Sequence, residues 1–295
     1  MAWIQITSIV AETEAEPLSD ALMELGALSV TFAETGEQEI FEPDIGTTPI
    51  WQQTRVLGLF DAQINSAECL LGLTQLMPEL SPSQFKVELI EDKDWVREWM
   101  DQFQPMLFGE NLWIVPSWLP APNPAATNLL LDPGLAFGTG THPTTAMCLG
   151  WLDNNPPVSK SVIDYGCGSG ILAIAAAKLG ASSVFATDID PQAITATLDN
   201  AQRNQVNLQA GLVKEIRLPT SELILANILA GPLAELAPIL SQHLQIDGQL
   251  VLSGLLVSQA ETLIACYQDV GIHMQLVNQH EDWALLVGVK TAKNP

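Results

Sequence analysis

Three glycines alternate with small residues in the sequence VIDYGCGSG, at Gly166, Gly168 and Gly170. The apolar run before them is typical of a buried strand, and GILAIAAAKLGA after them is typical of a helix. A glycine-rich turn between a strand and a helix lets a ligand approach the backbone closely. One acidic residue, Asp164, lies two positions before the first glycine. We therefore expect Asp164, Gly166 and Gly168 to belong to a small-molecule site.

A second acid, Asp188 in VFATDID, follows Gly166 by 22 residues. An acid at the end of the next strand suits ribose hydroxyls, a feature that dinucleotide and nucleoside cofactors share. The spacing here is G-x-G-x-G followed by Ile171, rather than the G-x-G-x-x-G of dinucleotide sites. The carboxylate of Asp164 would also repel a pyrophosphate. A cofactor with an ammonium group, a ribose and no phosphate fits better, which favours S-adenosylmethionine (SAM) over NAD.

Two acids in this region have a structural interpretation as well. Asp164 could cap the glycine turn, either instead of or in addition to facing a cofactor. Asp190 is expected to be the N-cap of a helix that begins at Pro191.

The stretch DPGLAFGTGTHPTT, residues 132–145, is a second glycine-rich segment. It contains no lysine, so it does not match a phosphate-binding P-loop. We expect a flap over the cofactor, with a tight structural turn as the alternative, and a helix that begins near Pro143. His142 in this stretch could assist a proton transfer or serve in packing.

From residue 160 onwards, apolar runs alternate with helical stretches. The runs are continuous, as expected for parallel strands that are covered on both faces. The last two, MQLVN and WALLVGVK, are separated only by QHED, which is too short for a crossover helix. The pattern predicts a doubly wound, Rossmann-like α/β domain that ends in an antiparallel hairpin at the sheet edge.

The first ninety-odd residues predict a separate unit. WIQITSIV, PLSDALMELGA and LSVTFAE form one β-α-β pattern, with Pro17 near the start of its helix, and VLGLFDA, SAECLLGLTQLM and FKVELI form another. Two such units in a short stretch predict a ferredoxin-like α+β domain. Residues 1–95 hold 17 acids and 3 bases, so this unit is the expected contact if the protein recognises a basic macromolecule.

An aromatic stripe separates the two predicted domains. Trp95, Trp99 and Phe103 recur at every fourth residue, which predicts a helix that packs one domain against the other, with a ligand-binding role as the alternative. PSWLPAPNPAATN then indicates a loop. The predicted division is a substrate-recognition domain at residues 1–94, a linker at 95–128 and the α/β domain at 129–295.

Composition limits the partners of the chain. Of the 295 residues, 34 are acidic and 11 are Lys or Arg, giving a formal net charge of −23. This excess disfavours direct nucleic-acid binding and either serves solubility alone or attracts a basic partner. The four cysteines lie far apart with no C-x-x-C pair, so we expect neither a metal site nor disulfides. No signal peptide or membrane span is indicated, and we expect a cytoplasmic protein.

Together, DPGLAFGTGTHPTT, VIDYGCGSGILAIAAAKLGA, TDIDPQAI and NILAGPLAELAP resemble the PrmA family of methyltransferases, which modify the eleventh protein of the large ribosomal subunit. The resemblance covers nearly the whole chain. It implies SAM as the cofactor, a basic ribosomal protein as the substrate, and methylation of lysine side chains and of the N-terminal amine. It also implies that Thr145 contacts the cofactor, that Gly166 lies against it and that Asp188 holds its ribose. Asn227 in NILA is then expected at the exit of the fourth strand, as a further cofactor-binding residue.

Asn227 also bears on the class of acceptor. Methyltransferases of planar amides or adenine amines often carry an Asn/Asp-Pro-Pro-aromatic motif at this strand end, whereas Ile228, Leu229 and Ala230 follow Asn227 here. This departure favours a flexible alkyl amine, which must lose its proton before it can attack. No residue identifies itself as the base. The alternatives left open are a methyltransferase of another basic protein or of a small amine, and a ribosome-associated SAM-binding module without turnover.

Overall fold

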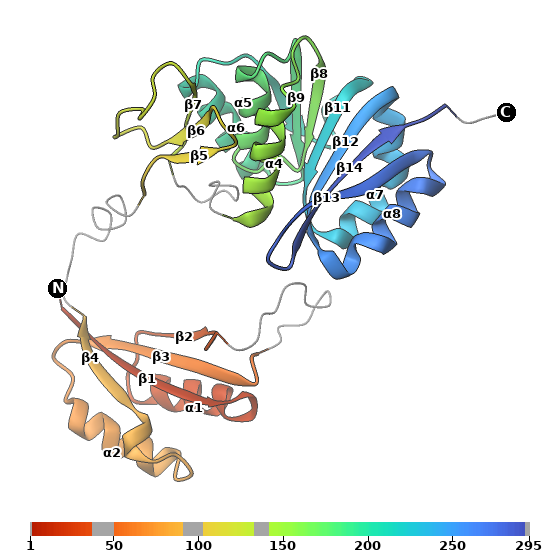
Figure 1. Ribbon diagram of the computed structural model, residues 1–295. Coiled ribbons are helices and arrows are strands. Elements are labelled where there is room, and N and C mark those ends of the chain that lie inside the picture. The colour runs from red at the N-terminus through yellow and green to blue at the C-terminus, as the bar shows by residue number, and fades with distance from the viewer. Residues whose placement is uncertain (1, 37–49, 91–102, 133–141, 293–295) are drawn as a thin grey trace. The chain divides into compact units, whose positions relative to one another are not determined.

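The computed structural model describes residues 2–36, 50–90, 103–132 and 142–292 (Figure 1). The chain divides into two compact units, Met1–Asp101 and Gln102–Pro295. The predicted helix around Trp95 and Trp99 and residues 133–141 of the second glycine-rich stretch lie outside the described residues.

The first unit is a four-stranded antiparallel sheet in the order β2-β3-β1-β4, with two helices packed on one face. Alternate strand residues, among them Ile6, Val10, Val56 and Phe60, turn inwards and are buried against these helices. The element order and strand order confirm the predicted ferredoxin-like α+β fold. The elements are β1 (Trp3–Ala11), α1 (Glu12–Glu24), β2 (Ser29–Ala33), β3 (Gln53–Asp61), α2 (Ser66–Leu76), the 3-10 turn η1 (Pro82–Gln84) and β4 (Lys86–Ile90).

The start of α1 differs from the prediction, because the helix begins five residues before Pro17. The backbone N–H of Ala11 donates to the carboxylate of Glu14 at 3.0 Å, and Glu12 adds a second acid to the first turn. Acids at a helix N-terminus are favourable because they interact with the positive end of the helix dipole. Pro17 therefore lies inside the helix rather than at its start.

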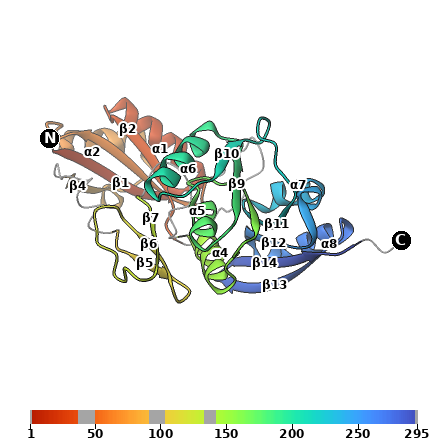
Figure 2. The ribbon, with the colours of Figure 1, turned by 90° about the horizontal axis from the view of Figure 1, so that it is seen from above.

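The second unit is built on a seven-stranded sheet in the order β10-β9-β8-β11-β12-β14-β13 (Figure 1; β10 is labelled in Figure 2). Neighbouring strands from β10 to β12 are parallel, whereas β14 is antiparallel to both of its neighbours. This arrangement confirms both the doubly wound α/β domain and its antiparallel hairpin. The strands are β8 (Ser161–Tyr165), β9 (Ser183–Asp188), β10 (Gln209–Leu212), β11 (Ser221–Asn227), β12 (Leu244–Leu256), β13 (Ile272–His280) and β14 (Trp283–Lys290).

Helices cover both faces of this sheet (Figures 1 and 2). Successive residues of β11 point to opposite faces, so that Leu223 and Leu225 enter one core cluster and Ile224 and Ala226 the other. Burial on both faces explains why the strands are continuous apolar runs. The helices are α4 (Pro143–Asn154), α5 (Ile171–Lys178) and α6 (Pro191–Arg203) on one side and α7 (Ala230–His243) and α8 (Ala260–Asp269) on the other, with the 3-10 turn η2 (Val257–Gln259) preceding α8.

Several short strands were not predicted. A three-stranded sheet formed by β5 (Met106–Phe108), β6 (Leu112–Val115) and β7 (Thr127–Leu130) lies where the sequence indicated a linker and loop. Buried Leu112, Ile114 and Leu129 make it part of the core that also contains α4 and α5. Strand β10 was missed as well. Runs of three or four residues are too short to show a strand periodicity.

Candidate cofactor site

Asp164, Asp188 and Asn227 lie at or next to the carboxyl ends of three neighbouring strands. Asp164 is the penultimate residue of β8, Asp188 ends β9 and Asn227 ends β11, in a sheet where β8 lies between the other two. The connections change direction between β8 and β11, which is the point where doubly wound sheets bind their ligands. The fold therefore brings these three predicted site residues to one edge.

The glycine turn after β8 has a left-handed backbone at all three glycines, with φ of 81°, 53° and 79° at Gly166, Gly168 and Gly170. Such angles are strained for residues that carry a Cβ atom. A Cβ atom at Gly166 would also collide with the side chain of Ile228, and one at Gly170 would lie 2.9 Å from the side chain of Thr197. The turn is thus tightly packed by the segments that follow β11 and by helix α6.

Asp164 is 1% exposed and acts as a cap for the helix that follows the turn. Its Oδ2 atom accepts a hydrogen bond from the N–H of Ala173, in the first turn of α5, at 2.9 Å. Its Oδ1 atom is buried and has no hydrogen-bond partner in the described part of the chain. Burial raises the pKa of Asp164 to about 7; the bond from Ala173 opposes this shift and the charge of Asp188 adds to it. A buried acceptor without a partner is costly unless a ligand donates to it.

Asp188 joins the end of β9 to the glycine turn. Its Oδ2 atom accepts from the N–H of Gly168 and its Oδ1 atom accepts from the N–H of Asp190, both at 3.0 Å. A carboxylate has about four lone-pair sites, so the side chain can accept further hydrogen bonds. Asp190 accepts from the N–H of Gln192 at 2.8 Å, which confirms the prediction that it is the N-cap of α6.

Thr145 and Asn227 are far apart in the sequence but bonded in the structure. Thr145 is fully buried in α4, and its Oγ1 atom accepts from the Nδ2 atom of Asn227 at 3.2 Å. The Oδ1 atom of Asn227 is buried without a hydrogen-bond partner among the described residues. A second unpaired acceptor therefore lies at the end of β11.

His142 holds the start of the helix that carries Thr145. It is the N-cap of α4, and its Nδ1 atom accepts from the N–H of Thr144 at 3.3 Å. Its ring also packs edge-on against Trp283 of β14, with ring centroids 4.8 Å apart. Burial lowers the pKa of His142, an effect that the charge of Glu281 opposes. These contacts support the packing role that the sequence left open.

One residue next to the predicted site residues was not singled out from the sequence. Ile189 lies between Asp188 and Asp190, and it is 87% exposed although its side chain is large and apolar. Exposed aliphatic side chains are common singly, but this one is next to an acid suited to a ribose. An isoleucine directly after the acid that ends the second strand could have indicated an apolar ligand surface.

The two cysteines near this site are not activated as nucleophiles. Cys148 and Cys167 are buried free thiols, and burial, with a smaller effect of the nearby Asp164 charge, raises the pKa of each to about 12. Both therefore stay protonated and weakly nucleophilic at neutral pH. No cluster of His, Cys, Asp and Glu that could hold a metal ion occurs in the described ranges. Within the same ranges, no helix is long and apolar enough to cross a membrane.

The sheet order, the glycine turn and the acid that ends β9 define a SAM-dependent methyltransferase with a Rossmann-like fold. The Oδ1 atoms of Asp164 and Asn227, buried acceptors without a partner among the described residues, fit a cofactor that carries an ammonium group. The chain belongs to the family "Ribosomal protein L11 methyltransferase (PrmA)", whose model matches residues 2–291.

Known proteins of this kind resemble the chain, two of them over nearly its whole length. A ribosomal protein L11 methyltransferase of Hydrogenovibrio crunogenus is 57% identical over 97% of both chains. One of Erwinia tasmaniensis is 50% identical over 98% of this chain and 100% of its own. The crystal structure of a ribosomal protein L11 methylase from Lactobacillus delbrueckii subsp. bulgaricus, 32% identical, covers 64% of this chain and 99% of its own with a TM-score of 0.58.

Proposed function

We propose that this protein methylates ribosomal protein L11, on lysine side chains and on the N-terminal amine, with SAM as the methyl donor. The observation that carries the proposal is the convergence of Asp164, Asp188 and Asn227 beside the glycine turn. The names of its relatives, ribosomal protein L11 methyltransferases over nearly the full length of the chain, support the choice of acceptor.

The residues at the edge of the sheet suit the parts of the cofactor. The free acceptor sites of Asp188 suit the ribose hydroxyls, and the exposed side chain of Ile189 offers an apolar face for the adenine. The Oδ1 atoms of Asp164 and Asn227, to which no described residue donates a hydrogen bond, suit the ammonium group. The backbone of Gly166 and Gly168 and the side chain of Thr145 complete the proposed set.

When bound, SAM supplies a methyl group that its sulfonium has already activated. The chain must then hold an uncharged amine in line with that methyl group, chiefly by proximity and orientation. A lysine amine has an ordinary pKa of about 10.4, and an apolar environment lowers it. Ile228 and Leu229, which follow Asn227, provide apolar side chains at this edge. We assign no general base.

We also propose roles for the two parts of the chain. Residues 1–94, with most of the excess acids, would recognise the basic substrate. The catalytic domain would be the second unit, Gln102–Pro295, because β5 to β7, which lie mostly within the predicted linker at 95–128, belong to its core. The excess of acids also argues against direct contact with nucleic acid, and a ribosomal-protein substrate would place the enzyme in the cytoplasm.

The test is intact-mass spectrometry of purified L11 after incubation with the enzyme and SAM, combined with calorimetric measurement of SAM binding. The wild-type enzyme should add methyl groups in steps. Asp188→Ala should weaken SAM binding by about one to two orders of magnitude, the effect of losing hydrogen bonds to a charged group. Asp190→Ala is the matched control, because it removes the same charge two residues away. It should cost about 1 kcal/mol of stability through the lost N-cap and leave SAM binding unchanged.

Each negative result points to a different alternative. SAM binding without any mass increase of L11 would favour another basic protein, a small amine or a binding module without turnover. Absence of SAM binding to the wild-type protein would contradict the cofactor site itself.

A further inference from the structure

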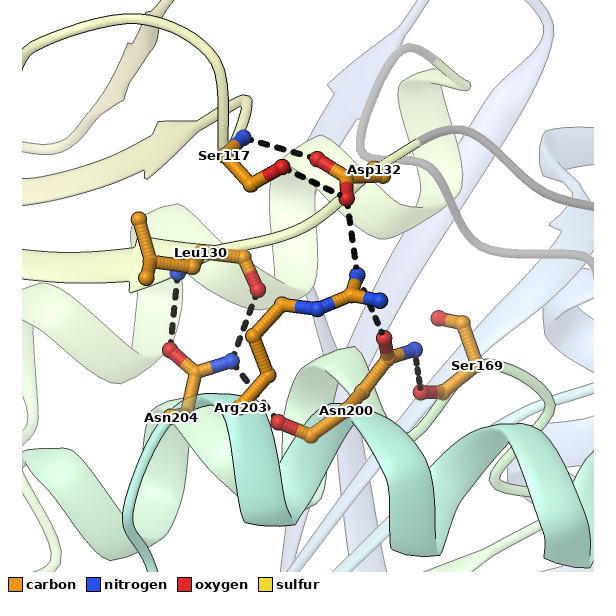
Figure 3. A network of polar contacts seen from close by, with 7 residues as sticks. All are labelled: Ser117, Leu130, Asp132, Ser169, Asn200, Arg203 and Asn204. Atoms are coloured by element: carbon orange, nitrogen blue, oxygen red, sulfur yellow. Dashed lines mark hydrogen bonds and ion pairs between the residues drawn. The ribbon is translucent and has the colours of Figure 1, made fainter.

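Four polar residues on one side of α6, the last of them its C-cap, bond to two separate segments of the chain; Figure 3 draws the last three. They are Thr197, Asn200, Arg203 and Asn204. Thr197, Asn200 and Asn204 are at most 9% exposed, at positions i, i+3 and i+7 that share one helix face. The buried face of a helix is ordinarily apolar, so a polar set there calls for an explanation.

The first segment is the glycine turn. The Oγ1 atom of Thr197 donates to the carbonyl oxygen of Gly168 at 3.1 Å. The Nδ2 atom of Asn200 donates to the next carbonyl oxygen, that of Ser169, at 2.9 Å. Two successive carbonyl groups of the turn are thus held by side chains of α6.

The second segment is the end of β7 and the residues that follow it. The side-chain amide of Asn204 accepts from the N–H of Leu130 and donates to its carbonyl oxygen, both at 2.7 Å, as a neighbouring strand would. The guanidinium of Arg203 pairs with the carboxylate of Asp132 at 2.9 Å. That carboxylate also accepts from the N–H and hydroxyl of Ser117, at 2.7 and 2.8 Å.

Arg203 and Asn200 connect the two segments, since the guanidinium also donates to the Oδ1 atom of Asn200 at 3.4 Å (Figure 3). The connection runs from Asp132 through Arg203 and Asn200 to the carbonyl of Ser169. Asp132 is the first residue of the stretch 132–145 that ends at Thr145. A single polar network therefore joins the start of that stretch to the glycine turn.

We propose that Arg203 and Asn200 are positioning residues of the cofactor site, which fix the position of the glycine turn relative to residues 130–132. The inference rests on the proposed SAM site. Neither residue is assigned a contact with reacting atoms. The side chain of Arg203 is 39% exposed, and ion pairs with this exposure contribute little to overall stability. Loss of the pair should therefore act on the geometry of the site rather than on folding.

The test compares SAM binding and steady-state methylation of L11 in full-length variants. Arg203→Met should raise both the Kd and the KM for SAM by about fivefold to tenfold and change kcat at saturating SAM by less than about twofold. Arg203→Lys keeps the positive charge opposite Asp132 but loses the planar guanidinium group. The Kd of this variant for SAM should therefore fall between those of the wild type and Arg203→Met. Gln202→Met is the control: this exposed neighbour forms no side-chain hydrogen bond to any described residue, and its Kd should equal that of the wild type.

A double-mutant cycle tests whether Asp132 and Arg203 act together. If they do, Asp132→Asn combined with Arg203→Met should raise the Kd by no more than the larger single effect. Independent, multiplicative effects would overturn the inference, as would a Kd for Arg203→Met within about twofold of the wild type or an equal change in Gln202→Met. Failure of the wild-type protein to bind SAM would overturn the proposed function, and this inference with it.

Discussion

The two carboxylate oxygens of Asp164 have different surroundings. Asp164 caps α5 through one carboxylate oxygen and leaves the other buried without a partner in the described part of the chain. Burial raises its pKa from an ordinary 3.8 to about 7. The folded protein therefore keeps a proton on Asp164 at pH values where the unfolded chain has released it. Stability contributed by this group must fall as the pH rises from about 4 to about 7.

The substitution Asp164→Asn should remove this pH dependence of stability, because an amide does not titrate. The free energy of unfolding of the variant, relative to the wild type, should increase between pH 4 and pH 7, by up to about 1.4 kcal/mol per pH unit. Urea unfolding at several pH values measures the difference. Asp190→Asn, the same chemical change at an exposed position, serves as the control. Parallel curves for the wild type and Asp164→Asn would show that Asp164 is not protonated in the folded protein.

At the scale of elements, helix α5 begins at a position that only glycine suits well. Gly170 has a φ of 79°, and a Cβ atom there would lie 2.9 Å from the side chain and 3.0 Å from the Cα atom of Thr197. The backbone angle and the close approach of α6 act in the same direction. The start of α5 and its close packing against α6 therefore both depend on this residue.

Gly170→Ala should lower the free energy of unfolding by about 2 kcal/mol or more, because both the strained backbone and the contact with α6 oppose a methyl group. Gly231→Ala is the matched control in helix α7, where a Cβ atom would meet nothing within 4 Å. It should raise stability by about 0.5–1 kcal/mol, since alanine loses less backbone entropy in a helix. Urea unfolding compares the two variants. Equal effects of the two substitutions would contradict the packing of the turn.

At the scale of the whole molecule, each unit has a hydrophobic core formed by its own residues. The core of the first unit is formed by residues between Ile4 and Phe85, and the two clusters of the second unit by residues from Met106 onwards. All the proposed cofactor contacts belong to the second unit. Folding and cofactor binding by the second unit should therefore not require the first.

We expect residues 102–295 alone to fold and to bind SAM with a Kd within about threefold of that of the full chain. The fragment should not methylate L11 at a detectable rate, because the proposed recognition domain is missing. Circular dichroism, calorimetry and intact-mass spectrometry check the three points. Methylation of L11 by the fragment at the full-length rate would exclude substrate recognition by the first unit.

The sequence by itself determined the features that depend on a few neighbouring residues. The glycine turn, the capping role of Asp190 and the alternation of strands and helices follow from local backbone demands and from hydrophobic periodicity. The likeness in stretches such as DPGLAFGTGTHPTT indicated the family, and the family match confirms it. These features could be predicted because each is encoded within one segment.

Only the tertiary structure decided the features that join distant segments. Asn204 bonds to Leu130 across 74 positions, and Asn227 to Thr145 across 82, so no sequence pattern indicates either pair. The strands β5 to β7 are too short to show a periodicity and are held by the core that they help to form. The raised pKa of Asp164 likewise results from burial by several elements at once. Contacts and desolvation of this kind depend on the packed fold, which local sequence patterns do not specify.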